Sequence, residues 1–346
     1  ISSFVMSIFT FQTGIYWRQK WLLLPYLFLG MSMIQKKIFL MLRNKKILIL
    51  GGKGFVGKNL LSKINHKENS ISIISRKYFS SNAKIILGDL TILNKKIMKS
   101  FIDYDIIFNC SGELKNIKKM EALHVKSQRK IISYLSKECL RKRKKVKWIQ
   151  VSSVGIFGFN NISKNDYINE HSEKNPSNYY ENSKLQSEEI IIRGSNKYLE
   201  YIILRPSTIY GKGMRSDFIQ KLNYYIKKRF FFYISSKNAI FNLIHINDVS
   251  DALILCAKNN IKNQTFNLSC NYRIREIVKI ICKHNKLNEP ILVINEKMMR
   301  FLIKVLSKFL NLNLNDRIIN ILVSKKFFES TKIKKILKFE PKINFQ

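Results

Sequence analysis

The chain has 346 residues, 46% of them hydrophobic, which is enough to bury the core of one large domain or two modest ones. Its formal charge is +39, from 62 Lys and Arg against 23 Asp and Glu. The cations are spread through every segment and match no nucleic-acid motif, so we interpret them as a compositional bias and expect no specific nucleic-acid partner. Five Cys without C-x-x-C spacing and five scattered His argue against a disulfide framework and a metal site, and fit a reducing compartment.

Residues 1–40 differ from the remainder. They carry four cations and no acid, which leaves +35 for the other residues (39 − 4 = 35). The apolar run 21–34 has 14 residues, fewer than the ~20 needed to span a bilayer. We expect an N-terminal extension that is non-native or unstructured, with translation starting at Met41 or Met33. A targeting peptide or signal-anchor is the alternative.

A glycine-rich turn follows the first predicted strand, 46–50, and precedes an amphipathic helix. Glycines three residues apart allow a tight turn, close approach of the backbone to a pyrophosphate and close packing of helix on strand. The helix N-terminus supplies free N–H groups for phosphates. A plain turn is the alternative, but the flanking strand and helix favour a dinucleotide site. Its expected contacts are Gly51, Gly54, Phe55, Val56 and Gly57.

The second predicted strand, 71–75, bears on the choice of cofactor. An NAD site normally has an acidic residue near its end to hold the ribose 2′-hydroxyl. This chain has Ser75 followed by Arg76, which suits a 2′-phosphate better. We therefore expect NADP or NAD, with NADP favoured. The alternative is that Arg76 has no functional meaning, because the chain is rich in basic residues throughout.

A Tyr and a Lys lie four residues apart in the helix predicted after Asn175-Pro176, so Tyr180 and Lys184 share one helical face. A phenol with an unperturbed pKa of ~10 is a poor base near neutrality. An adjacent ammonium favours the phenolate and lowers that pKa, so the pair indicates a general acid/base. A hydroxyl donor, Ser153, precedes it in a compatible order.

The order of elements predicts an α/β fold, a Rossmann-type doubly wound parallel sheet with a smaller C-terminal substrate-binding lobe. Residues 41–211 are expected to form the NAD(P)-binding domain and 212–346 mainly the lobe. The run 298–309 has apolar residues at helical spacing among cations. It fits core packing, which we favour, or a basic membrane-surface helix. The predicted strands are 46–50, 71–75, 84–87, 105–109, 146–152 and 200–205.

With these motifs in order, the chain resembles the extended short-chain dehydrogenase/reductase family, in its nucleotide-sugar epimerase/dehydratase/reductase branch, from about residue 45 onward. Several matches in family order are more specific than any one of them. Beyond the glycine turn and the Tyr-Lys pair, they are Gly88-Asp89-Leu90, Asn109-Cys110-Ser111-Gly112, 151–158, 204–211, 244–249 and Phe266-Asn267-Leu268.

The resemblance implies roles by position. Ser153 would bond the substrate oxygen that alternates between alcohol and ketone, Tyr180 would carry the proton, and Lys184 would hold the nicotinamide ribose and depress the Tyr pKa. Hydride would move between the sugar carbon and the nicotinamide. Further cofactor contacts would be Asp89 and Leu90 beside the adenine, then Cys110, Ser111, Gly112 and Pro206. Substrate contacts would be Ser207, Thr208 and Arg317.

Departures from the family pattern narrow the reaction. Val154-Gly155 stands where dehydrating members carry an Asp-Glu pair, so we set 4,6-dehydration aside. Ser207-Thr208 is more typical of reductases and of some polysaccharide-pathway epimerases. Phe241 replaces an Arg that clamps the diphosphate, so either Arg317 supplies that charge or the substrate is not an ordinary nucleotide diphosphate sugar. His124 stands where the family commonly has Asn.

We therefore expect a cytoplasmic NAD(P)-dependent 4-epimerase or 4-ketoreductase of a nucleotide sugar, UDP-linked, in polysaccharide biosynthesis. Peripheral membrane contact and a homodimer are compatible with this assignment. The alternatives are a non-catalytic nucleotide-binding assembly protein of the same fold and a reductase of another carbonyl substrate.

Overall fold

The computed structural model describes residues 42–158, 167–214, 218–310, 316–343 and 345. The described residues all belong to one compact unit, 42–346. The extension expected at 1–40, with Met33 and Met41, therefore lies outside the described residues. None of the helices over the described ranges combines the length and apolar character that a membrane-spanning segment needs.

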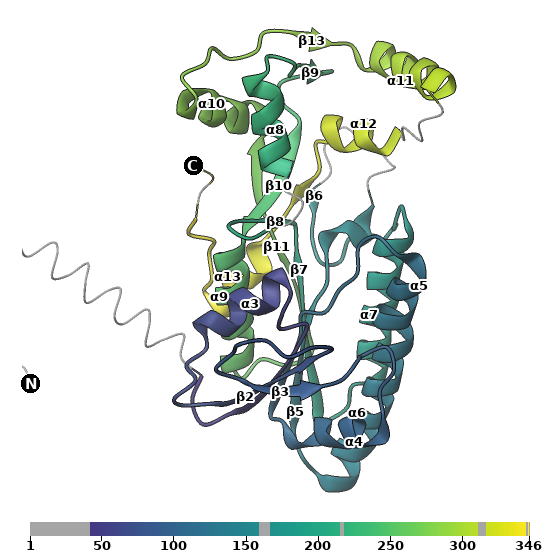
Figure 1. Cartoon of the computed structure of the whole chain (residues 1–346), viewed down its shortest axis with the longest axis vertical. Coiled ribbons are helices and arrows are strands. Elements are labelled where there is room, and N and C mark those ends of the chain that lie inside the picture. Colours follow the sequence, from purple (N-terminus) through teal and green to yellow (C-terminus); the bar gives the residue numbers. More distant parts are fainter. Residues whose placement is uncertain (1–41, 159–166, 215–217, 311–315, 344, 346) are drawn as a thin grey trace, which may run out of the picture. The chain divides into compact units, whose positions relative to one another are not determined.

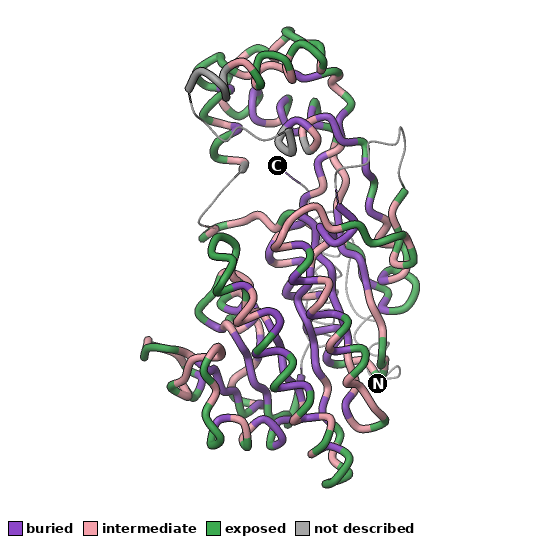
Figure 2. The backbone as a smooth tube through the Cα atoms, turned by 90° about the vertical axis from the view of Figure 1, so that its right-hand side faces the viewer, coloured by how far each residue is buried: buried purple, intermediate pink, exposed green. Residues whose placement is uncertain are grey.

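A sheet of seven parallel strands forms the centre of the fold (Figure 1) and confirms the predicted Rossmann-type architecture. The central strands β1 (Lys46–Leu50) and β4 (Ile106–Asn109) are almost entirely apolar, as expected where helices cover both faces of a sheet. Figure 2 shows these buried strands between helices whose outer surfaces are exposed. The strand order is β3 (Lys84–Leu87), β2 (Ser70–Ser75), β1 (Lys46–Leu50), β4 (Ile106–Asn109), β5 (Val146–Val151), β7 (Leu199–Pro206) and β11 (Gln264–Leu268).

The strand order reverses between β1 and β4, because β2 and β3 lie on one side of β1 and the later strands on the other. Ligands of doubly wound folds bind outside the carboxyl ends of the strands at such a switch point. The glycine turn follows the carboxyl end of β1, Cys110 to Gly112 follow that of β4, and Ser153 follows that of β5. This topology therefore gathers segments that are about 100 residues apart in the sequence.

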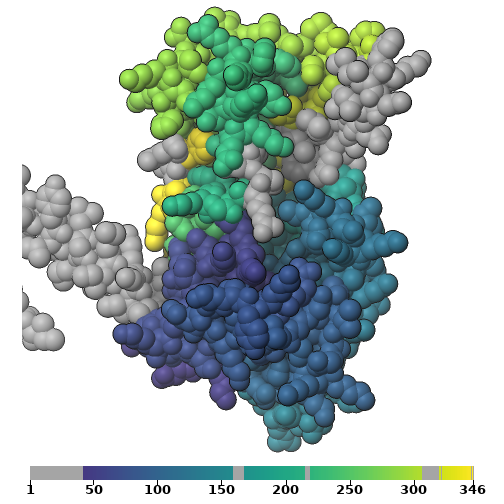
Figure 3. Space-filling model, viewed as in Figure 1, coloured from purple at the N-terminus to yellow at the C-terminus, as the bar shows by residue number. Residues whose placement is uncertain are grey.

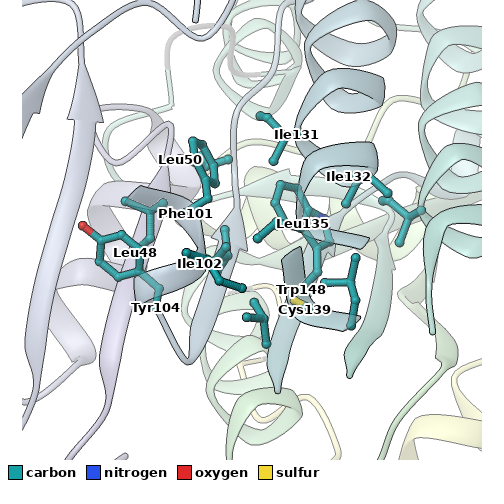
Figure 4. Close-up of a cluster of buried hydrophobic side chains, with 14 of the residues drawn as sticks. Leu48, Leu50, Phe101, Ile102, Tyr104, Ile131, Ile132, Leu135, Cys139 and Trp148 are labelled. Atoms are coloured by element: carbon teal, nitrogen blue, oxygen red, sulfur yellow. The ribbon is translucent and has the colours of Figure 1, made fainter. Parts of the chain in front are cut away.

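Helices pack on the sheet in two groups. Helix α3 (Phe55–Lys63) packs against α9 (Ile246–Lys258), and α6 (Gln128–Lys142) packs against α7 (Tyr179–Gly194). The α6 side contains a large apolar cluster in which Ile131 and Leu135 lie against the side chains of β1 and β5 (Figure 4). Shorter elements on this side are α4 (Lys95–Ser100), η1 (Phe101–Asp103), α5 (Ile117–Met120), the π-helix η2 (Glu121–Ser127) and η3 (Val154–Phe157).

Helix α9 and strand β11 return to the large sheet, so the range 212–346 contributes to both parts of the fold. The remaining segments form small sheets and helices. Their strands are β6 (Tyr167–Ile168), β8 (Thr208–Tyr210), β9 (Tyr233–Ile234), β10 (Ile240–His245), β12 (Cys270–Arg273), β13 (Val293–Ile294) and β14 (Phe327–Phe328). Their helices are α8 (Phe218–Lys227), α10 (Ile274–His284), α11 (Glu296–Leu310), α12 (Asp316–Val323) and α13 (Thr331–Leu337). Of these elements, α8, β10 and α10 pack around a second apolar cluster.

Candidate functional site

The glycine turn after β1 is tightly built. Gly51 has φ +74°, and a Cβ atom there would lie 2.7 Å from the Cα of Ser111, so the turns after β1 and β4 touch backbone to backbone. A Cβ atom on Gly57 would lie 2.3 Å from the Gly51 carbonyl oxygen, so helix α3 starts directly on the turn. Gly54 caps α3 without a side-chain acceptor, which leaves the first N–H groups available to phosphate. These residues fit a dinucleotide.

Ser75, Arg76 and Asp89 lie near one another beyond the ends of β2 and β3. The Asp89 carboxylate accepts hydrogen bonds from Thr91 N at 2.8 Å and Thr91 Oγ1 at 2.7 Å. Burial raises the pKa of Asp89, but these bonds and the Arg76 charge lower it by more, so the carboxyl is ionised. The Ser75 hydroxyl donates to Lys77 O at 2.8 Å. The Leu90 side chain packs against the large apolar cluster on the α6 side of the sheet.

Helix α7 carries the predicted catalytic pair. It begins at Tyr179, because the Asn178 side chain accepts a hydrogen bond from Glu181 N at 3.1 Å. The Lys184 side chain is buried, and its Nζ donates to Val151 O at 3.2 Å and lies 5.9 Å from the centre of the Tyr180 ring. Lys184 is thereby fixed at the end of β5. Burial lowers the pKa of Lys184 to about 8, although the Glu188 carboxylate opposes this.

The expectation that Lys184 depresses the pKa of Tyr180 was wrong for this structure. Burial raises the pKa of Tyr180 to about 12, and the nearby Glu181 carboxylate adds to the increase. The Lys184 ammonium lies 5.9 Å from the centre of the ring, and loss of solvent around the phenol dominates the shift. Tyr180 is therefore a phenol at neutral pH, ready to donate a proton.

Ser153 follows β5 and caps η3, where its Oγ accepts a hydrogen bond from Gly155 N at 3.0 Å. The preceding residue ties this segment to α7, because Ser152 Oγ donates to Glu188 Oε1 at 2.5 Å. Glu188 also pairs with Arg205 of β7 at 2.6 Å, and both side chains are almost completely buried. These contacts hold the segment that carries Ser153 against the helix that carries Tyr180 and Lys184.

The loop after β4 meets the same helix. A Cβ atom on Gly112 would lie 3.9 Å from both Lys184 Nζ and His124 Nε2, so the three groups are neighbours. Burial raises the pKa of the Cys110 thiol to about 12 despite Lys184, so Cys110 is a protonated packing residue. All five Cys are free thiols. Within the described part, no three potential metal-ligating side chains gather in one place.

His124 is a site residue that sequence reasoning noted only as a departure from the family pattern. Its Nε2 accepts a hydrogen bond from Glu113 N at 3.0 Å, and its Nδ1 lies 2.8 Å from Ser183 Oγ. The ring packs edge-on to Tyr180 with centroids 6.0 Å apart. Burial and the Lys184 charge lower the pKa of His124 to about 3, so it is neutral.

The expected substrate residues are only partly brought together. Pro206 and Ser207 are buried at the end of β7, whereas Thr208 is exposed on β8. Within the part of the chain that the structure describes, neither Ser207 Oγ nor the side-chain amide of Asn267, on the adjacent strand β11, has a hydrogen-bond partner. Sequence reasoning used Asn267 only as a family motif, and its burial could not be read from that. Phe241 packs in the apolar cluster of the lobe, and the side chain of Arg317 lies outside the described residues.

Comparison with known proteins fits this geometry. The model of the NAD dependent epimerase/dehydratase family matches residues 47–269, which is more than half of the chain. Among solved structures, MoeE5 in complex with UDP-glucuronic acid and NAD is similar, with a TM-score of 0.65 at 16% identity over 86% of this chain and 94% of that chain. UDP-glucuronic acid 4-epimerase from Bacillus cereus in complex with NAD gives 0.64 at 15% identity over 87% and 94%.

A third similar structure is ADP-L-glycero-D-manno-heptose-6-epimerase from Helicobacter pylori, with a TM-score of 0.63 at 18% identity over 88% of this chain and 93% of that chain. At these identities the likeness shows the fold. The residues that match the family model include the glycine turn and the helix that carries Tyr180 and Lys184. The chain belongs to the NAD dependent epimerase/dehydratase family and is an NAD-dependent enzyme of the extended short-chain dehydrogenase/reductase type.

Proposed function

We propose that this enzyme acts at carbon 4 of a nucleotide sugar, UDP-linked, as a 4-epimerase or 4-ketoreductase that uses Ser153, Tyr180 and Lys184. One observation carries the proposal. The Lys184 ammonium, on the same helical face as Tyr180, is anchored to Val151 O at the end of β5, two residues before Ser153. A proton donor, a hydroxyl and a buried cation thus come from adjoining segments at the carboxyl end of β5, the strand next to β4.

The roles of the chain's own groups follow from this arrangement. The bound nicotinamide dinucleotide supplies the hydride acceptor or donor. The N–H groups at the start of α3 would hold its phosphates, and Asp89 and Arg76 would contact its adenosine. Ser153 orients the oxygen on carbon 4, and Tyr180 gives that oxygen a proton when the ketone is reduced. In the oxidative direction Tyr180 takes the proton back.

Dehydration does not fit the residues beside Ser153. Val154 and Gly155 are buried and cannot transfer a proton. Arg76 is exposed and would suit the 2′-phosphate of NADP, but the ionised Asp89 close to it would repel a phosphate, so we propose NAD as the cofactor. A reductase of another carbonyl compound is the second candidate, because Phe241 is built into the apolar cluster and offers no charge to a diphosphate. We place the reaction in the cytoplasm, where cofactor and nucleotide sugar are available.

The test is to incubate purified protein with UDP-sugars and UDP-4-keto-sugars while the absorbance of reduced nicotinamide is followed. An epimerase regenerates its bound cofactor at each turnover, whereas a reductase consumes the reduced cofactor stoichiometrically. Tyr180→Phe should lower turnover about 100-fold or more and leave cofactor binding intact. Tyr179→Phe, which removes the hydroxyl bonded to Glu121, is the matched control. Near-wild-type turnover of Tyr180→Phe would contradict the proposal.

A further inference from the structure

Two adjacent segments of the lobe expose apolar side chains. Strands β9 and β13 pair in parallel, and Tyr233 N donates to Leu292 O at 2.9 Å, so the chain around 230 runs beside the chain around 291. Phe230 is 70% exposed and Ile291 is 84% exposed, and Leu292 and Val293 are exposed as well. Three consecutive exposed apolar residues are costly in water and indicate a contact surface.

Helix α11 begins three residues after Val293 and extends this surface. Its inner face packs, because Met299 and Ile303 contact the apolar cluster around Ile234. Its outer face is apolar too, with Met298, Phe301 and Leu302 exposed at helical spacing. The packing of Met299 and Ile303 supports the core-packing interpretation of 298–309 for one face of the helix, and the membrane-surface interpretation stays a prediction. We call Phe230, Ile291, Leu292, Val293, Met298, Phe301 and Leu302 the lobe edge. Figure 3 shows the yellow-green atoms of β13 and α11 at the molecular surface.

Positive charge borders the lobe edge. Residues 218–230 contain four Lys and Arg and no Asp or Glu. Three of these cations, Lys227, Lys228 and Arg229, are exposed and directly precede Phe230. The carboxylates nearest in sequence to Ile291 are already engaged, because Glu289 pairs with Arg275 and Glu296 pairs with Arg300. Exposed apolar side chains thus lie beside a cationic segment.

We propose that the lobe edge docks on an anionic membrane surface. Apolar groups inserted at the acyl boundary and cations held at the headgroups are the combination that interfacial binding requires. A second copy of the chain is a poorer occupant. A two-fold contact would place the cations of 227–229 on both sides of one interface, where they repel. Docking is independent of the reaction proposed above, so either can fail alone.

Co-sedimentation with vesicles tests this in the full chain, so that residues outside the described part are the same in every sample. The vesicles contain either phosphatidylcholine alone or equal parts of phosphatidylcholine and phosphatidylglycerol, at about 0.1 M salt. We expect binding to the anionic vesicles. The double variant Ile291→Ser, Phe301→Ser should bind about tenfold less tightly or weaker. The matched control is Tyr78→Ser, Ile92→Ser. It removes two apolar side chains that are 71% and 80% exposed but lie outside the lobe edge, so it should leave vesicle binding unchanged.

The charge is tested in the same way. The triple variant Lys227→Gln, Lys228→Gln, Arg229→Gln should lose about fivefold in affinity per cation. Lys95→Gln, Lys96→Gln, Lys99→Gln removes the same charge from exposed positions on α4 and should change binding little. Equal losses in variants and controls would overturn the proposal. So would an Ile291→Ser, Phe301→Ser protein that changes oligomeric state in light scattering but binds vesicles normally, because the edge would then be an interface between copies.

Discussion

Lys184 is the residue whose ionisation should be visible in kinetics. Its burial lowers its pKa to about 8, so it carries charge below that pH and loses it above. Tyr180, with its pKa near 12, stays protonated over the same range. We therefore expect kcat/KM for ketone reduction to be flat from about pH 6 to 8 and to fall above pH 8, because kcat/KM reports the free enzyme. Lys184→Met should remove that inflection along with most activity. An inflection that persists in Lys184→Met belongs to another group.

His124 gives a second prediction. Because Glu113 N–H donates to Nε2, the proton of the neutral ring is on Nδ1 and is donated to Ser183 Oγ, which in turn donates to Tyr180 O at 2.8 Å. The ring therefore positions the turn of α7 that carries Tyr180. His124→Ala should lower kcat about tenfold with little change in KM for the sugar.

His124→Asn retains a short donor and acceptor and should recover part of kcat. The pH profile should not move in either variant, since His124 does not titrate above pH 5. A shifted profile would show that the ring transfers protons and is not a positioning residue.

Asn267 carries the third prediction. Its amide is fully buried and has no hydrogen-bond partner among the described residues, a state that costs about 1–3 kcal/mol. Asn267→Leu should therefore raise the thermal midpoint of the ligand-free protein while weakening binding of the nucleotide sugar. Asn109→Leu is the control. The Asn109 amide donates hydrogen bonds to Gln128 and Gln150, so its replacement should destabilise the protein. A destabilised Asn267→Leu with normal affinity would mean that the amide serves the fold.

At the scale of elements, the Glu188–Arg205 pair joins α7 to β7, and Ser152 joins both to β5. Breaking one side of a buried pair leaves an unpaired charge and costs about 3–5 kcal/mol. Glu188→Gln should therefore lower the free energy of unfolding by that amount in urea titration. The control is Glu189→Gln, at the next position, which removes an exposed partner of Arg193. It should change the free energy of unfolding by about 0–1 kcal/mol. Similar losses in the two variants would contradict the role of the buried pair.

Most of the large sheet was predictable from apolar runs, because a parallel strand covered on both faces is apolar along its whole length. The first strand was predicted at 46–50 and is observed there, and the predicted 71–75 is observed as Ser70–Ser75. Strand β11 was not predicted. Its sequence, QTFNL, mixes polar and apolar residues, so it forms no apolar run. The strand forms because it pairs with β7 at the sheet edge, and β7 is about 60 residues away in the sequence.

The site was predictable to the extent that it depends on local spacing. Tyr180 and Lys184 are four residues apart on one helix, and the helix was placed correctly by its preceding loop. The sign of the Tyr180 shift was not predictable, because it depends on how much solvent the folded chain removes. The partners of His124 are 11 and 59 residues away, so no local pattern could reveal that it joins the β4 loop to α7.

At the scale of the whole molecule, the charge of +39 and the lobe edge make separable predictions. Charge alone binds any polyanion, so duplex DNA should bind without sequence preference. The affinity should fall by about 10³-fold or more between 50 and 200 mM salt if six or more phosphates are contacted. Fluorescence anisotropy with two unrelated duplexes measures both properties.

The same pair of triple variants distinguishes diffuse charge from an organised surface. On DNA, the variants at 227–229 and at 95, 96 and 99 remove equal charge and should weaken binding equally. On anionic vesicles, only the first set borders the lobe edge, so only it should matter. Affinity for one duplex that survives physiological salt would instead reveal a specific nucleic-acid site. If the two triple variants lose equal affinity for DNA but only the variant at 227–229 loses affinity for vesicles, membrane binding depends on the lobe edge and the cations beside it. The other positive charges then reflect composition alone.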